Sequence, residues 1–142
     1  MTTELTKRIY TATATATGGR EGHATSSDKI IDLDLQPPTE MGGPGGATNP
    51  EQLFAAGYAA CFQGALGVVG RREKVDTSQS TVEADVTIGS VSGGGFGLAV
   101  ALKVTIPGVD EAKARELTEA AHQVCPYSNA TRGNIEVTIE VG

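Results

Sequence analysis

The chain has 142 residues, which is close to the commonest size of a single domain. Its formal net charge is −6, and its 11 Lys and Arg residues are scattered along the sequence. An acidic chain without a basic cluster is a poor ligand for nucleic acid or for an anionic membrane. We therefore expect one domain over residues 1–142, with neither nucleic acid nor a membrane as its main partner.

The first residues, 1–7, contain no apolar core of the kind that a signal peptide needs. The expected compartment is therefore the cytoplasm, where thiols are kept reduced. In such a compartment a pair of cysteines is more often catalytic or metal-binding than a structural disulfide. The chain has two cysteines, Cys61 and Cys125.

The first third of the chain has the pattern of a β-hairpin. Residues 7–17 alternate, with Thr11, Thr13, Thr15 and Thr17 on one face and Tyr10, Ala12, Ala14 and Ala16 on the other, which predicts a strand. Glycines over 18–22 break it, and a second strand is predicted over 29–35, with Arg20 in the turn. The Gly-rich segment 42–46 predicts a mobile loop; it lacks the Gly-Lys-Ser/Thr continuation of a phosphate-binding loop.

A long apolar helix is predicted next. Asn49 is a good N-cap, Pro50 fits the first helical position, and Gln52 follows three residues after the cap. The helix extends to about Gly70, and Gln63 is its only strongly polar side chain. An isolated apolar run of 18 residues that is rich in Gly and Ala is a weak membrane span, so we expect a core helix packed on a sheet.

The rest of the chain predicts three strands and one helix. The strands cover residues 80–88, 96–106 and 135–141. Asp110 caps an amphipathic helix that runs to Val124 and is ended by Pro126. The order β-β-α-β-β-α-β indicates an α+β fold with mostly antiparallel sheets packed around the long central helix. With no Trp and few other aromatic residues the core is small, which favours association with a second copy.

The two cysteines lie in different surroundings. Cys61 is in the middle of the apolar helix, where burial raises the pKa of a thiol unless a cation is near. As an alternative it is a small core residue without chemistry. Cys125 closes the second helix, and the negative end of the helix dipole disfavours a thiolate there. Cys125 is therefore the poorer nucleophile and the better second thiol.

A nucleophilic Cys61 needs a positive partner from elsewhere in the chain. Arg20 is the leading candidate because it lies between glycines in a turn, although it could be a solvated turn residue. Glu51, in the first turn of the helix, could hold the guanidinium by a bidentate pair. Alternatively, its negative charge is simply well placed at the positive end of the helix dipole. The other candidate cations are Arg71, Arg72, Arg132, His23 and His122.

Glu51 and Cys61 are separated by ten residues of one helix, or about 15 Å of rise. They cannot touch along a straight helix. Arg20 must therefore bridge them, the helix must bend, or Glu51 must come from another subunit. We favour a site assembled at a dimer interface.

Two segments resemble a known family. Residues 51–62 (EQLFAAGYAACF) resemble the peroxidatic-cysteine helix of the bacterial organic hydroperoxide resistance proteins, and residues 121–134 (AHQVCPYSNATRGN) resemble their resolving-cysteine segment. This branch belongs to the osmotically induced protein C superfamily. The opening strands, the 42–46 loop and the closing strand fit the same pattern, so the resemblance covers essentially the whole chain.

The resemblance implies a two-cysteine thiol peroxidase that reduces alkyl and lipid hydroperoxides. Cys61 would form a sulfenic acid, Cys125 would close a disulfide, and Arg20 and Glu51 would activate Cys61. The family members are intertwined homodimers with active sites at the interface. They use no bound cofactor or metal and are recycled by a dithiol, typically a lipoyl group on a protein.

Two other kinds of function stay open. A metal site could use both cysteines with His122 and His23, although the usual ligand spacings are missing. A dimeric scaffold with inert buried thiols is the second. An apolar substrate pocket, or alternatively plain core, is expected from a set of large side chains: Phe54, Phe62, Phe96, Leu98 and Tyr127.

Overall fold

The structure, a computed structural model, describes residues 2–142. It forms two compact units, one up to Leu53 and one over Phe54–Gly142, which are described separately below. The chain is α+β, with two three-stranded sheets and a long helix. Three of the four strand pairings are antiparallel, as predicted. The single domain expected from the length stays a prediction.

The first unit holds a three-stranded antiparallel sheet in the order β1-β2-β3. Its strands are β1 (Ala14–Thr17), β2 (His23–Ser26) and β3 (Asp32–Asp34). The predicted hairpin is wrong in its pairing, because β2 lies between the two predicted strands. The predicted strand over 7–17 is also too long: the strand covers only residues 14–17, which pair with β2, and a strand needs a neighbour to satisfy its backbone groups.

Arg20 lies in the connection between β1 and β2, as predicted, within the 3-10 helix η1 (Gly19–Glu21). The turn depends on glycine. Gly18 has φ of 74°, and a Cβ on Gly22 would lie 1.8 Å from the carbonyl oxygen of Thr17. A second 3-10 helix, η2 (Thr39–Met41), precedes the Gly-rich loop.

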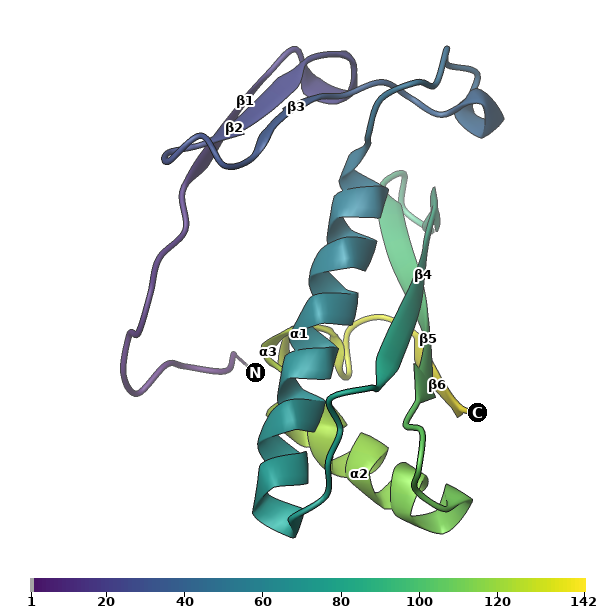
Figure 1. Cartoon of the computed structure of the whole chain (residues 1–142). Helices are drawn as coiled ribbons and strands as arrows, with labels where there is room; N and C mark the ends of the chain where they lie inside the picture. Colours follow the sequence, from purple (N-terminus) through teal and green to yellow (C-terminus); the bar gives the residue numbers. More distant parts are fainter. Residues whose placement is uncertain (1) are drawn as a thin grey trace. The chain divides into compact units, whose positions relative to one another are not determined.

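The second unit is built on the long helix α1 (Pro50–Glu73), which runs beside a sheet of order β4-β5-β6 (Figure 1). Strands β4 (Thr81–Ser90) and β5 (Phe96–Thr105) are antiparallel, and β6 (Val137–Val141) joins β5 in parallel. Side chains of α1, β5 and helix α2 (Glu111–Val124) form one buried core. It includes Tyr58, Phe62, Leu66, Val100, Leu102, Val104, Leu117 and Ala121.

The predicted start of α1 is confirmed. The backbone N–H of Gln52 donates to Asn49 Oδ1 at 2.8 Å, so Asn49 is the N-cap. By length and composition, α1 is also long and apolar enough to cross a membrane, with a mean hydropathy of 1.5 over its most apolar window and a third of that window buried. The core helix of a soluble protein has the same properties, and the burial of Phe62, Leu66 and Val69 fits that interpretation.

Two helices connect β5 to β6. Helix α2 (Glu111–Val124) begins as predicted, because the N–H of Lys113 donates to Asp110 Oδ1 at 2.8 Å. The short helix α3 (Pro126–Thr131) was not predicted. Pro126 does end α2, but it also starts α3, since a proline fits the first helical position.

Candidate active site

Two free thiols face one another in the second unit. Cys125 Sγ lies 3.4 Å from Cys61 Sγ and is directed toward it. Cys61, on α1, is half-buried, whereas Cys125 is fully buried. A molecule arriving from solvent therefore meets Cys61 first. The structure thus brings together the two cysteines that the sequence singled out.

Burial, with a smaller contribution from the neighbouring Cys125, raises the pKa of the Cys61 thiol to about 11, although a hydrogen bond from the backbone of Tyr127 acts in the opposite direction. Within the described residues 54–142, no cationic side chain lowers this pKa. Only the thiolate is a good nucleophile. In the surroundings that the second unit provides, the Cys61 thiol is therefore protonated at neutral pH. A positive charge near its sulfur would be needed to form the thiolate.

Cys125 lies at a junction of two helices, which the sequence-based argument missed. It follows the last residue of α2 and is also the N-cap of α3, where its Sγ accepts from the N–H of Ser128 at 3.5 Å. The negative end of one helix and the positive end of another meet at this sulfur. The prediction from the sequence considered only the first of these two helix ends.

In the first unit, Arg20 and Glu51 form a bidentate ion pair. Arg20 Nη1 donates to Glu51 Oε2 at 2.8 Å, and Nη2 donates to Oε1 at 2.7 Å. The Arg20 guanidinium holds the pKa of the Glu51 carboxyl below its usual range, mainly through these hydrogen bonds. The Glu51 side chain is 14 % exposed and that of Arg20 39 %. The pairing that the sequence suggested is present, and it orients a guanidinium that is still accessible.

Near the two cysteines, three buried hydroxyl groups form a network that the sequence did not suggest. Tyr58 Oη lies 2.9 Å from Ser128 Oγ and 3.0 Å from Thr131 Oγ1. His122 Nδ1 lies 2.8 Å from the same Ser128 Oγ. One signal for the network was available, since a tyrosine inside a buried helix usually has a partner for its hydroxyl.

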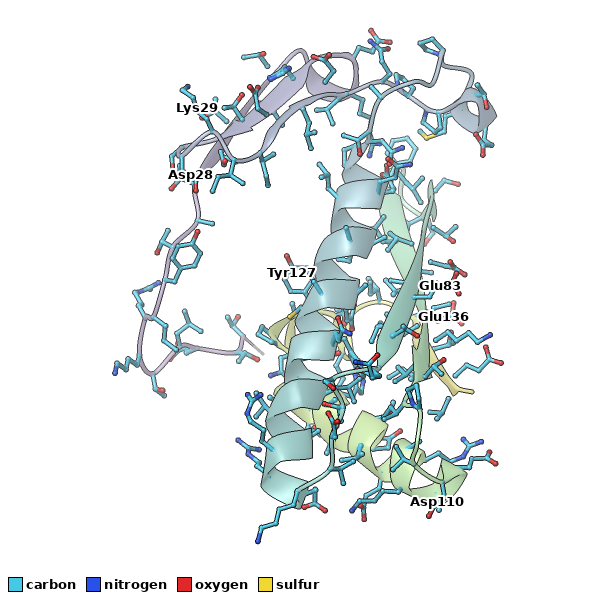
Figure 2. All side chains as sticks on the ribbon, in the orientation of Figure 1. Asp28, Lys29, Glu83, Asp110, Tyr127 and Glu136 are labelled. Atoms are coloured by element: carbon cyan, nitrogen blue, oxygen red, sulfur yellow. The ribbon has the colours of Figure 1, made fainter. Side chains whose placement is uncertain are left out.

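Aromatic rings cluster on the α1 side of this site. Phe54, Tyr58 and Tyr127 have ring centroids 5.7 to 6.2 Å apart. Tyr127 lies beside α1 (Figure 2), and a Cβ on Gly57 would be only 3.1 Å from its hydroxyl. The absence of a side chain at Gly57 thus leaves room for the Tyr127 ring, one helical turn before Cys61.

Phe54 and Tyr127 are therefore the two members of the predicted apolar set that lie in this cluster. Phe62 is core, because it is fully buried. Phe96 is 80 % exposed at the start of β5, and Leu98 lines a separate hollow with Asn134 and Ile135.

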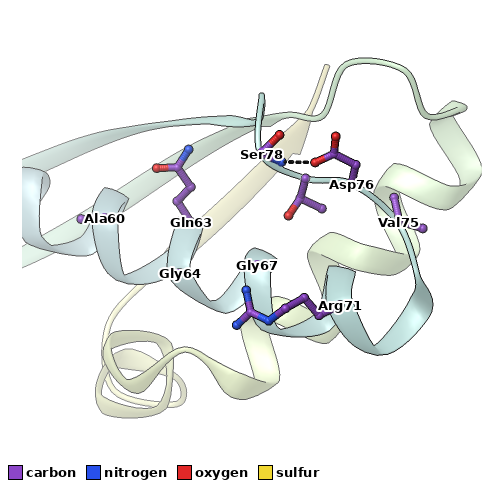
Figure 3. A pocket seen from close by; sticks show the side chains of 9 residues that line it. Ala60, Gln63, Gly64, Gly67, Arg71, Val75, Asp76 and Ser78 are labelled. Carbon is purple, nitrogen blue, oxygen red and sulfur yellow. Dashed lines mark hydrogen bonds between the residues drawn. The ribbon is translucent and has the colours of Figure 1, made fainter.

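A larger open groove of about 520 Å³ lies along α1 and contains neither cysteine. Gln63, Gly64, Gly67 and Arg71 line it from the helix, and residues 75–78 line it from the following segment (Figure 3). The Arg71 guanidinium lies over Gly67, 3.4 Å from where a Cβ would be. This groove is not the thiol site.

No group of three or more His, Cys, Asp and Glu side chains among residues 2–142 is arranged to hold a metal ion. His122 is paired with Ser128, and His23 lies between Asp32 and Asp34 of β3. The ligand set of the metal-binding alternative is therefore not assembled in the described chain.

Comparison with known proteins identifies the family. The sequence pattern of the family described as "OsmC-like protein" matches residues 43–140. The organic hydroperoxide resistance protein of Xanthomonas axonopodis pv. citri is 56 % identical over 94 % of both chains. The organic hydroperoxide resistance protein OhrB of Bacillus subtilis is 47 % identical over 94 % of this chain and 98 % of that protein.

Solved structures give the same result. A putative organic hydroperoxide resistance protein from Vibrio cholerae has a TM-score of 0.93 at 51 % identity, over 97 % of this chain and 95 % of that one. The structure of Bacillus subtilis OhrB has a TM-score of 0.86, over 94 % of this chain and 98 % of that one. The resemblance first seen in residues 51–62 and 121–134 is confirmed: the chain belongs to the OsmC-like protein family, on its organic hydroperoxide resistance branch.

Proposed function

We propose that this protein is a two-cysteine thiol peroxidase that reduces organic hydroperoxides to alcohols and so protects the cell from oxidative stress. The observation that carries the proposal is the 3.4 Å approach of a half-buried and a fully buried thiol, in a chain whose relatives are named organic hydroperoxide resistance proteins. Cys61 is the attacking residue because it is the more accessible one. Cys125 is the resolving residue.

The first step is a displacement at oxygen. The Cys61 thiolate attacks the terminal oxygen of ROOH, the O–O bond breaks, and the alkoxide takes a proton and leaves as ROH. Sulfur is oxidised by two electrons to the sulfenic acid, and the peroxide is reduced by the same two. In the second step the Cys125 sulfur attacks the Cys61 sulfur, an S–S bond forms, and the hydroxyl group leaves as water.

Arg20 and Glu51 supply the activation that the second unit lacks. A thiol with a pKa of about 11 is thiolate in only roughly one molecule in ten thousand at pH 7. A guanidinium close to the sulfur would favour the charged form. The bidentate pair with Glu51 keeps Arg20 oriented, and its exposed edge leaves donors free for this task. In this proposal Arg20 lies next to Cys61 in the working enzyme.

The working enzyme is proposed to be an intertwined homodimer. Three small residues, Ala56, Ala60 and Gly64, form an exposed row at i, i+4 and i+8 of α1. Such a row permits close approach by a second helix, and the open groove adjoins it. Light scattering should give twice the chain mass of 14.5 kDa. A monomer at micromolar concentration would contradict the dimer.

A dithiol is the proposed reductant, with a lipoylated protein as its natural source and the cytoplasm as its compartment. Attack on the Cys61 sulfur gives a mixed disulfide, which the second thiol of a dithiol resolves without another molecule. Dihydrolipoamide should therefore restore both thiols faster than an equal concentration of glutathione thiol. Equal rates would argue against a dedicated dithiol reductant.

The whole proposal is tested by counting free thiols on the reduced protein after one equivalent of oxidant. We expect rapid loss of both thiols with cumene hydroperoxide and slower loss with hydrogen peroxide, because Phe54 and Tyr127 favour an apolar substrate. Cys61→Ser should retain the Cys125 thiol. Retention of both thiols in the unmodified protein would overturn the peroxidase proposal.

A further inference from the structure

The buried hydroxyl network joins the two helices that carry the cysteines. Tyr58 belongs to α1 and lies three residues before Cys61. Ser128 belongs to α3 and lies three residues after Cys125. The 2.9 Å contact between their hydroxyl groups therefore fixes α1 to α3 one turn away from each sulfur. These residues are separated by 70 positions in sequence, so no local preference accounts for the contact.

Ser128 is the centre of the network. Its Oγ lies between Tyr58 Oη and His122 Nδ1, at 2.9 and 2.8 Å, and its backbone N–H points at Cys125 Sγ. Its carbonyl oxygen accepts from Thr131 Oγ1 at 3.3 Å. The hydroxyl, the backbone N–H and the carbonyl of this fully buried residue therefore all have partners, and the partner of the N–H is the resolving sulfur.

The other side of α3 is tied to α2. Arg132, which follows α3, donates to the backbone carbonyl of His122 and, at 2.8 Å, to Asn129 Oδ1. The imidazole of His122 lies against the ring of Phe62, with centroids 6.5 Å apart. Helix α3 has only six residues and is held in place by polar contacts to both of its neighbours.

Buried hydroxyl groups thus hold this small helix. Burying polar groups costs free energy unless they are paired, and an apolar junction of the same shape would serve stability as well. What paired polar groups add is one defined geometry, since each donor must meet its acceptor. Here that geometry lies about one helical turn from each of the two sulfurs.

We propose that Ser128, held by Tyr58 and His122, is a positioning residue for the resolving step, which sets the approach of Cys125 to Cys61. The inference rests on the peroxidase function proposed above and deepens it. Ser128 does not react. It holds the two sulfurs at 3.4 Å, within the range of about 3 to 3.5 Å from which reacting atoms can proceed directly.

The consequence is a partition between two fates of the Cys61 sulfenic acid. It either condenses with Cys125 or meets a second peroxide and becomes a sulfinic acid. Misplacing reacting groups by about 1 Å can cost on the order of a hundredfold in rate. Loss of the network should thus slow disulfide formation and leave more protein over-oxidised, with much less effect on the first attack.

The experiment compares Ser128→Ala and Tyr58→Phe with the unmodified protein under single-turnover conditions. Rapid mixing with cumene hydroperoxide gives the rate of Cys61 oxidation, and intact mass after quenching gives the ratio of disulfide to sulfinic acid. Tyr58→Phe retains the ring that packs on Phe54 and Tyr127, so it is the gentler variant. We expect about tenfold slower disulfide formation in Ser128→Ala, a smaller loss in Tyr58→Phe, and little loss in Thr131→Ser, which keeps its hydroxyl.

Thr118→Val is the matched control. Thr118 is a buried hydroxyl residue on α2, and within the described chain its Oγ1 has no hydrogen-bond partner. Its replacement should change neither step. A variant that is merely destabilised loses both steps together, which would contradict a positioning role for that residue.

The outcomes separate the inference from the proposed function. If cumene hydroperoxide does not oxidise Cys61 of the unmodified protein rapidly, the peroxidase function fails. If it does, but Ser128→Ala forms the disulfide equally fast, the positioning role is overturned and the function stands. A second measurement needs no peroxide. On equilibration with oxidised glutathione, the equilibrium constant for forming the Cys61–Cys125 disulfide should be about tenfold lower in Ser128→Ala than in the unmodified protein.

Discussion

Cys125 Sγ lies 3.4 Å from Cys61 Sγ although 64 positions separate the two residues in sequence. A disulfide bond is about 2.05 Å long, so the sulfurs must approach by only about 1.4 Å to become bonded. Neither helix has to unfold for that movement. The dithiol and disulfide states can therefore share one fold.

Removing the positive charge of Arg20 should raise the pKa of the Cys61 thiol. An opposite charge within a few ångströms shifts a pKa by about 1 to 3 units. In a Cys125→Ser background, where Cys61 is the only thiol, adding Arg20→Gln should thus lower the rate of Cys61 alkylation at pH 7 about tenfold to a thousandfold. The pH profile of the reaction with iodoacetamide measures this. Arg8→Gln, an exposed arginine of the same unit, is the control, and an unchanged midpoint in Arg20→Gln would contradict the role of Arg20.

Glu51→Gln should have a smaller effect than Arg20→Gln. Arg20 remains charged without its partner, because a guanidinium does not lose its proton in proteins. It loses its orientation, since both hydrogen bonds end on the Glu51 carboxylate. We expect an intermediate rate of cumene hydroperoxide consumption at pH 7. A loss as large as that of Arg20→Gln would show that Glu51 does more than hold the guanidinium.

The start of α1 shows what local sequence determines. The cap at Asn49 was predictable because it depends on residues within one turn. The side chain of Gln52, three residues after the cap, accepts from Thr48 Oγ1 at 2.9 Å. The sequence pattern therefore located the start of the helix correctly.

The two histidines should titrate on opposite sides of 6.5, the ordinary pKa of the side chain. Hydrogen bonds that His23 donates to Asp32 and, to a lesser extent, to Asp34 raise the pKa of its imidazole. Burial, and then the charge of Arg132, lower the pKa of His122, while Glu119 acts in the opposite direction. The chain has only these two histidines, so proton NMR resolves both curves. Two coincident curves would contradict this assignment.

The raised pKa of His23 also gives a stability dependence with a defined sign. The folded state binds the proton more tightly than the unfolded chain, so the contribution is complete below pH 6.5 and is lost as the pH rises through the higher folded value. Asp32→Asn should lower the pKa of His23 toward 6.5 and remove most of the dependence. Hydrogen exchange of the β2–β3 amides between pH 6 and 8 measures it, with Asp85→Asn, on β4, as the control.

Gly70→Ala should destabilise the protein although alanine favours helices. A Cβ at Gly70 would lie 2.7 Å from Thr77 Cγ2 and 2.9 Å from the carbonyl oxygen of Val75. Overpacking of this kind costs about 1 to 3 kcal/mol, which exceeds the gain of about 1 kcal/mol in helix propensity. Urea denaturation measures the difference. Gly67→Ala is the control, because its Cβ would meet only the flexible end of Arg71; equal stability of the two variants would contradict the packing described.

Features that depend on distant residues could not be read from the sequence. Strand β2 has a weak pattern of its own and exists because β1 and β3 flank it. Helix α3 has six residues, too few for a periodic signal, and is held by contacts from Tyr58 and Arg132. The cysteines and the Arg20–Glu51 pair were found because their chemistry is specific. Ser128 was missed because a serine in a loop-like segment has no such signature.

The most direct test of the central claim is to locate the first sulfenic acid. Cys125→Ser and Cys61→Ser are each treated with one equivalent of cumene hydroperoxide in the presence of dimedone, and the adduct is mapped by peptide mass. The account predicts labelling of Cys61 in the first variant and unmodified Cys125 in the second. Equal labelling of Cys125, or no label on Cys61, would contradict the assignment of Cys61 as the peroxide-reactive residue.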